Sequence, residues 1–124
     1  MAKRARIVAE TLGRSAEARA AAHLAAQGYA VIAQRVKTKA GEIDLIVKRG
    51  PVTAFVEVKA RARLDEAAAA VTKRQATRIR NAAMVWLGTG GNGDDAGDCR
   101  FDIVLVSPYE EPVHIENAFG EELW

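Results

Sequence analysis

Two acidic residues and a lysine interrupt two apolar segments near the middle of this 124-residue chain. Asp44 lies within "GEIDLIVK", and Glu57 and Lys59 lie within "TAFVEVKA". Aspartate is depleted in β-strands, so its place inside an apolar run requires a reason. Paired carboxylates bind Mg²⁺ or Mn²⁺, and an amine beside them can contact a phosphate. This combination indicates metal-assisted hydrolysis of a phosphodiester bond.

The two segments predict a β-hairpin with strands over 42–48 and 53–60, joined by "RGPV". A hairpin closed symmetrically about Gly50 and Pro51 puts Asp44 opposite Glu57, with Cβ atoms about 4.5–5.5 Å apart. Strict alternation would also put Ile43 on the opposite face from Asp44, together with Leu45 and Val47.

Two carboxylates at that separation repel each other and raise each other's pKa values unless they share a proton or a cation. We expect Asp44 and Glu57 to bind the metal, and Lys59 to position water and counter developing negative charge. A structural alternative remains open. A Glu-x-Lys pattern is common on solvated strands, and Asp44 could be a buried acid paired with an arginine.

Several further elements must position these residues. The Ala-rich segment 14–27 predicts a helix that ends at Gly28, with an apolar stripe through Ala16, Ala20 and Leu24. Thr72 and Gln75 form a capping-box pattern that begins a second helix over about 72–87. Other predicted strands cover 29–36, 100–106 and 113–119, and residues 88–98 predict a mobile loop. We therefore expect one α/β domain over 1–124, with a mixed sheet flanked by helices.

Charge divides the chain unevenly. Residues 1–80 contain 17 Lys/Arg and 7 Asp/Glu, whereas residues 81–124 contain 1 and 9. A basic segment of this kind, which includes a predicted flexible tail over 1–11, favours a polyanionic partner, although it could also be a solubilising surface. The expected nucleic-acid-binding residues are Arg61 and Arg63, which continue the strand parity of Lys59, and Lys73 and Arg74 in the first turn of the second helix.

Other features limit the choice of function. No apolar run is long enough to span a membrane, and the N-terminus lacks the apolar core of a secretory signal. Together with the single Cys99, this favours the reducing cytoplasm. Arg100 and Asp102 share a strand face, and we expect them to form a structural pair. His23 and His114 have no partner at zinc-ligand spacing and are taken as non-catalytic.

The pattern of Asp44 followed by Glu57-x-Lys59 resembles the core of the PD-(D/E)xK nuclease superfamily. The stretches "GEIDLIV", "FVEVKARA", "AVTKRQATRI", "CRFDIVLV" and "HIENAF" look like the YraN family of small bacterial proteins. That family is similar to archaeal Holliday-junction resolvases. The resemblance implies a restriction-endonuclease-like αβββαβ core and a predicted endonuclease whose substrate is not established.

The resemblance also implies further site residues. Glu17 on the first helix would add a metal contact, and Glu42 and Gln75 are additional candidates, although capping explains Gln75 equally well. The superfamily's proline is Ile43 here. The expected substrate is DNA rather than RNA, branched or damaged in one version, and a homodimer would suit cuts on two strands.

Two other functions stay open: a nucleic-acid-binding module that does not cut, and a protein-interaction factor that uses the acidic C-terminal portion.

Overall fold

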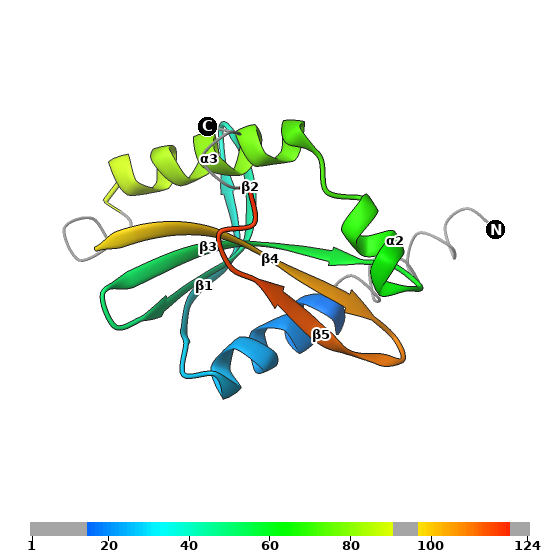
Figure 1. Cartoon of the computed structure of the whole chain (residues 1–124). Coiled ribbons are helices and arrows are strands. Elements are labelled where there is room, and N and C mark those ends of the chain that lie inside the picture. Colours follow the sequence, from blue (N-terminus) through cyan, green and yellow to red (C-terminus); the bar gives the residue numbers. More distant parts are fainter. Residues whose placement is uncertain (1–14, 91–96, 120–124) are drawn as a thin grey trace.

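The computed structural model describes residues 15–90 and 97–119 (Figure 1). The predicted basic tail and most of the predicted loop at 88–98 lie outside these residues. The core is one five-stranded sheet in the order β1-β2-β3-β4-β5. Its strands are β1 (Ala30–Thr38), β2 (Gly41–Arg49), β3 (Val52–Ala60), β4 (Asp98–Ser107) and β5 (Glu110–Ile115).

Helices cover both faces of this sheet. The N-terminal helix, described over residues 15–26, lies on one face. The second face carries α2 (Leu64–Ala69) and α3 (Lys73–Gly88), as Figure 1 shows. The short helix α2 was not predicted, whereas α3 begins and ends within one residue of the predicted helix. Its capping box is present, because Thr72 Oγ1 accepts from the Gln75 backbone N–H and Gln75 Oε1 accepts from that of Thr72.

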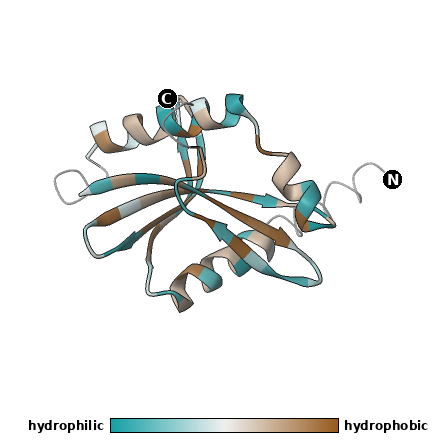
Figure 2. Ribbon diagram, in the orientation of Figure 1, coloured by the Kyte–Doolittle hydropathy of each residue, from teal (hydrophilic) through white to brown (hydrophobic). Residues whose placement is uncertain are grey.

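Two hydrophobic clusters lie on opposite sides of the sheet, and Figure 2 shows hydrophobic residues following the strands between the helices. The first joins α2 and α3 to the sheet around Ile46, Phe55 and Ile79. The second joins the predicted stripe of the N-terminal helix, including Leu24, to Leu45, Val47 and neighbouring residues. A sheet buried on both faces explains why its central strands are apolar almost throughout.

The predicted pairing of the strands is confirmed. β1, β2 and β3 form an antiparallel meander, and β4 returns parallel to β3 after α3. The β2–β3 register is the predicted one, with Leu45 opposite Val56 and Ile46 opposite Phe55. A mixed sheet of this order with helices on both faces has the arrangement of a restriction-endonuclease-like core.

Strict alternation fails at the end of the β2–β3 ladder. Ile43 packs in the cluster of Ile46 and α3, and not with Leu45 and Val47 as predicted. The backbone pairing of β2 with β3 ends at Leu45, and the Asp44 carboxylate, not a strand carbonyl, accepts the Val58 N–H. The alternation is therefore interrupted where side-chain hydrogen bonding replaces the ladder.

The last predicted strand, 113–119, was placed too far along the chain, since β5 covers Glu110–Ile115. Asn117 adopts a left-handed backbone conformation with φ 49°, and its N–H donates to the Asp102 carboxylate. The Asn117 N–H therefore bonds to the Asp102 side chain and not to a neighbouring strand, and the chain turns at Asn117 instead of continuing as β5.

Candidate functional site

Asp44, Glu57 and Lys59 come together at the point where the β2–β3 ladder ends. Lys59 Nζ lies 3.3 Å from Glu57 Oε1, and both side chains are largely buried. Asp44 Oδ2 accepts the Val58 N–H at 2.8 Å, which fixes the Asp44 carboxylate beside the residue between Glu57 and Lys59. The predicted grouping of these three residues is therefore what the structure shows.

Both carboxyl groups are held in an environment that disfavours their negative charge. Burial raises the pKa of Asp44, and the hydrogen bond from Val58 only partly offsets this. Burial, and then the neighbouring charge of Asp44, raises the pKa of Glu57 to about 7, although Lys59 acts in the opposite direction. The positive charge of Lys59 therefore does not fully compensate the negative charges of these two partly buried acids.

The uncompensated negative charge of Asp44 and Glu57 indicates whether these residues fit a metal ion. Two partly buried carboxylates with raised pKa values would be stabilised by a cation between them, and hard oxygen ligands are the donors that Mg²⁺ and Mn²⁺ prefer. Asp44 and Glu57 therefore fit as metal-binding residues. Within residues 15–90 and 97–119, no three or more His, Cys, Asp or Glu side chains gather as a metal-binding group.

Glu17, the third predicted metal-binding residue, is engaged elsewhere. Its Oε2 lies 3.5 Å from Arg35 Nε, and the same Nε lies 3.9 Å from Glu42 Oε1. Arg35 has a left-handed backbone conformation, with φ 52°, and stands between the β1 residues paired with Leu45 and Ile43, opposite Asp44. Arg35 therefore links Glu17 and Glu42 beside the site.

Sequence reasoning did not identify this role of Arg35. The β1–β2 register would have indicated it, had that register been predicted.

The three candidate residues of the second helix, Lys73, Arg74 and Gln75, lie in the first turn of α3, as predicted. Lys73 and Arg74 are exposed in the first turn of α3, where the helix dipole favours anions. The side chain of Gln75 is used in the capping box, as the structural alternative predicted. Nucleic-acid binding by Lys73 and Arg74 stays a prediction.

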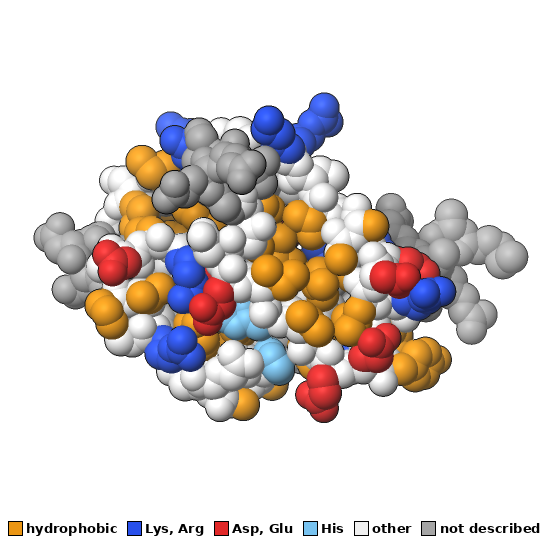
Figure 3. Space-filling view, viewed as in Figure 1, with side chains coloured by type: hydrophobic (Ala, Val, Ile, Leu, Met, Phe, Trp, Pro, Cys, Tyr) orange, Lys and Arg blue, Asp and Glu red, His pale blue; other side chains and the backbone are white. Residues whose placement is uncertain are grey.

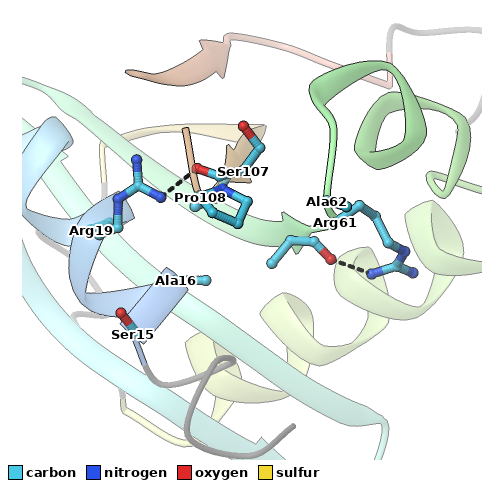
Figure 4. Close-up of a pocket in the computed structure, with 9 residues that line it drawn as sticks. Ser15, Ala16, Arg19, Arg61, Ala62, Ser107 and Pro108 are labelled. Carbon is cyan, nitrogen blue, oxygen red and sulfur yellow. Dashed lines mark hydrogen bonds between the residues drawn. The ribbon is translucent and has the colours of Figure 1, made fainter. Parts of the chain in front are cut away.

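Arg61 and Arg63 lie beyond the end of the Lys59 strand, so the predicted continuation of the strand parity to them was wrong, while nucleic-acid binding by these two residues stays a prediction. β3 ends at Ala60, and Arg63 precedes α2 and pairs with Asp65 at 2.8 Å. Arg61 turns back onto the Ala60 carbonyl and lines a separate pocket of about 590 Å³ (Figure 4). Arg19 also lines this pocket, where its guanidinium donates to the Ser107 and Glu110 carbonyls.

A second polar cluster is buried around Asp102, which has no exposed surface. Arg100 donates two hydrogen bonds to its carboxylate, His114 Nε2 lies 2.7 Å from Oδ2, and the Asn117 N–H reaches Oδ1. Burial by itself would raise the pKa of Asp102, but these hydrogen bonds together lower it. The predicted Arg100–Asp102 pair is confirmed, while the contribution of His114 was not predicted.

Basic side chains gather over one helix. On the face shown in Figure 3, Lys and Arg side chains stand out over α3, whereas lower on this face Asp and Glu side chains lie among further Lys and Arg side chains. No helix in the described residues has the length and apolarity needed to cross a membrane.

Comparison with known proteins finds one family that matches most of this chain. A model of the uncharacterised protein family UPF0102 matches residues 16–106. A UPF0102 protein of Rhodopseudomonas palustris (strain HaA2) is 54% identical, over 92% of this chain and 88% of its own length. Others from Bradyrhizobium sp. (strain ORS 278) and Nitrobacter winogradskyi are 51% and 47% identical over 92% of this chain, and over 80% and 96% of their own lengths. The family match and these relatives cover both halves of the site, so the chain belongs to the uncharacterised protein family UPF0102, as the resemblance to YraN proteins predicted.

Proposed function

We propose that this protein is a metal-dependent endonuclease that hydrolyses phosphodiester bonds in DNA. The observation that carries the proposal is the grouping of Asp44, Glu57 and Lys59, two partly buried carboxylates with raised pKa values beside one lysine. A set with uncompensated negative charge is costly for the folded protein, and a bound cation would remove that cost. The basic surface over α3 supports a polyanionic substrate.

Asp44 and Glu57 would hold the metal, and Glu17 is a candidate for a further contact if it leaves Arg35. When bound, Mg²⁺ or Mn²⁺ would supply positive charge to the phosphate and lower the pKa of a coordinated water. The Val58 N–H keeps the Asp44 carboxylate in place for this task. Lys59 is held by Glu57 and can donate a hydrogen bond to the attacking water or to a phosphate oxygen.

The test is cleavage of end-labelled linear, nicked and four-way-junction DNA, and of single-stranded RNA, with Mg²⁺ or Mn²⁺. Asp44→Asn and Lys59→Ala are compared with Glu66→Gln and Lys39→Ala, which change an exposed acidic residue and an exposed lysine. We expect metal-dependent cleavage by the wild type and both controls, and its loss in both site variants. Cleavage that survives in both site variants would refute this assignment.

The substrate that is cleaved fastest would indicate which nucleic-acid structure the enzyme acts on. Salt-sensitive DNA binding with no cleavage under any condition would instead favour a binding module on a nuclease fold. Absence of both binding and cleavage would favour a protein-interaction role.

A further inference from the structure

Arg78 on α3 lies directly across the backbone of Gly41, the first residue of β2. Gly41 has φ 144°, and a Cβ atom added there would lie 2.7 Å from Arg78 Cγ and 3.0 Å from Cδ. The aliphatic part of Arg78 therefore occupies the space that any other residue at position 41 would fill. Because Gly41, the glycine of "GEID", has no side chain, the Arg78 side chain can pack against the backbone three residues before Asp44.

The positive charge of Arg78 acts on the candidate site. Its positive charge lowers the pKa of Glu57, against the effect of burial and of Asp44, so the guanidinium acts on that carboxylate. The ion pairs of the other arginines in the described part of the chain involve Arg35, Arg49, Arg63 and Arg100. Within residues 15–90 and 97–119, Arg78 forms no hydrogen bond or ion pair, so the described part of the chain does not use its donors.

We propose that Arg78 is a substrate-binding residue of this site, and that its guanidinium binds the non-bridging oxygens of a backbone phosphate beside Lys59. This inference rests on the proposed function and names how the substrate is held. The guanidinium is a planar fork that matches two phosphate oxygens, which an ammonium group cannot do. Because the aliphatic part of Arg78 already packs against Gly41, its side chain loses less conformational freedom when the phosphate binds.

A structural role for Arg78 makes a different prediction. If its only task were to neutralise Glu57, any cation at the position would serve, and Arg78→Lys would behave like the wild type. If it grips a phosphate, Arg78→Lys keeps the charge but loses the paired hydrogen bonds. Substrate affinity therefore separates the two roles, while a measure of folding alone does not.

The experiment measures the dissociation constant of a fluorescent DNA duplex in EDTA, over a series of salt concentrations. The variants are Arg78→Ala, Arg78→Lys, Gly41→Ala, and Arg80→Ala as a control of equal charge. Residue 80 is exposed on the same helix but points about 200° away around its axis. Thermal unfolding of each variant shows whether it is folded, and Arg78 is exposed, so its replacement leaves the core intact.

We expect Arg78→Ala to weaken binding about tenfold, a loss of about 1.4 kcal/mol, and to reduce the salt dependence by about one phosphate contact. Arg80→Ala should weaken binding less than threefold, and Arg78→Lys should recover only part of the loss. Gly41→Ala should resemble Arg78→Ala, with no further loss in the double variant. If Gly41→Ala does not fold, the two Arg78 variants still decide the matter.

Equal effects of Arg78→Ala and Arg80→Ala, or full recovery by lysine, would overturn the assignment of Arg78. The same variants assayed for cleavage separate this inference from the proposed function. Cleavage that is normal in Arg78→Ala refutes the role of Arg78 and leaves the nuclease. Binding that depends on Arg78 without cleavage by the wild type supports the role of Arg78 and removes the hydrolysis. A wild type that binds no nucleic acid overturns both.

Discussion

Replacement of Glu57 by glutamine is expected to stabilise the metal-free protein at alkaline pH. The pKa of Glu57 rises on folding from an ordinary 4.5 to about 7. The folded state therefore binds the proton more tightly than the unfolded state, and the free energy of unfolding falls as pH rises through this range. From these two pKa values the cost is about 3 kcal/mol at pH 8 and about 1 kcal/mol at pH 5.

Glutamine keeps the shape of protonated Glu57 and cannot ionise, so it does not incur this cost. The pKa of about 7 already includes the effect of Lys59, so the difference between the gains at pH 8 and pH 5 should be about 2.5 kcal/mol. For a domain of this size that corresponds to about 10 °C in melting temperature.

The assay is urea unfolding of wild type, Glu57→Gln and Glu66→Gln in EDTA at pH 5 and pH 8. Glu66 is an exposed glutamate on α2, so Glu66→Gln serves as a control for the loss of one charge. We expect the advantage of Glu57→Gln over wild type to grow with pH, and that of Glu66→Gln to stay constant. An advantage independent of pH would refute the reasoning that burial and Asp44 disfavour the Glu57 charge.

Three further perturbations test other parts of the structure. Adding Mg²⁺ or Mn²⁺ should raise the melting temperature of the wild type and leave Asp44→Asn and Glu57→Gln unchanged, as thermal-shift measurements would show, because a cation that binds only the folded state stabilises it. Asp102→Asn should lower the free energy of unfolding at neutral pH by about 3 kcal/mol, since Arg100 loses a buried partner; urea unfolding that matches the wild type would contradict this. Thr72→Ala should cost about 1 kcal/mol through loss of the α3 capping box, whereas Thr77→Ala, within the same helix, should cost less in the same assay.

Most of the fold could be read from local patterns. The capping box at Thr72 and Gln75 predicted where α3 begins, because it satisfies backbone N–H groups within four neighbouring residues. The turn at Gly50 and Pro51 fixed the hairpin register, since a short turn leaves few ways to pair its strands. Helix α2 escaped prediction because six residues give too short a period to recognise, and its position depends on packing of Ala67 against the sheet.

Predictions about individual side chains likewise succeeded where they depended on local sequence and failed where they depended on distant segments. The Asp44, Glu57 and Lys59 grouping followed from a single hairpin, so it needed no knowledge of distant segments. Arg63 was misplaced because β3 ends at Ala60, and Arg63 then precedes α2. The ion pair of Glu17 with Arg35, and the packing of Arg78 against Gly41, join elements that the sequence alone does not place side by side.

By itself, then, the sequence determined most of the elements, the hairpin that holds the two acids and the lysine, and the family. These depend on contacts between residues close in the chain, where spacing and residue type fix the geometry. Only the tertiary structure decided the interruption of alternation at Ile43, the Asp102 cluster and the exposure of Arg78 beside Glu57. Each of these depends on burial and charge contributed by several distant segments, and the energy of a buried charge is set by all of its neighbours together.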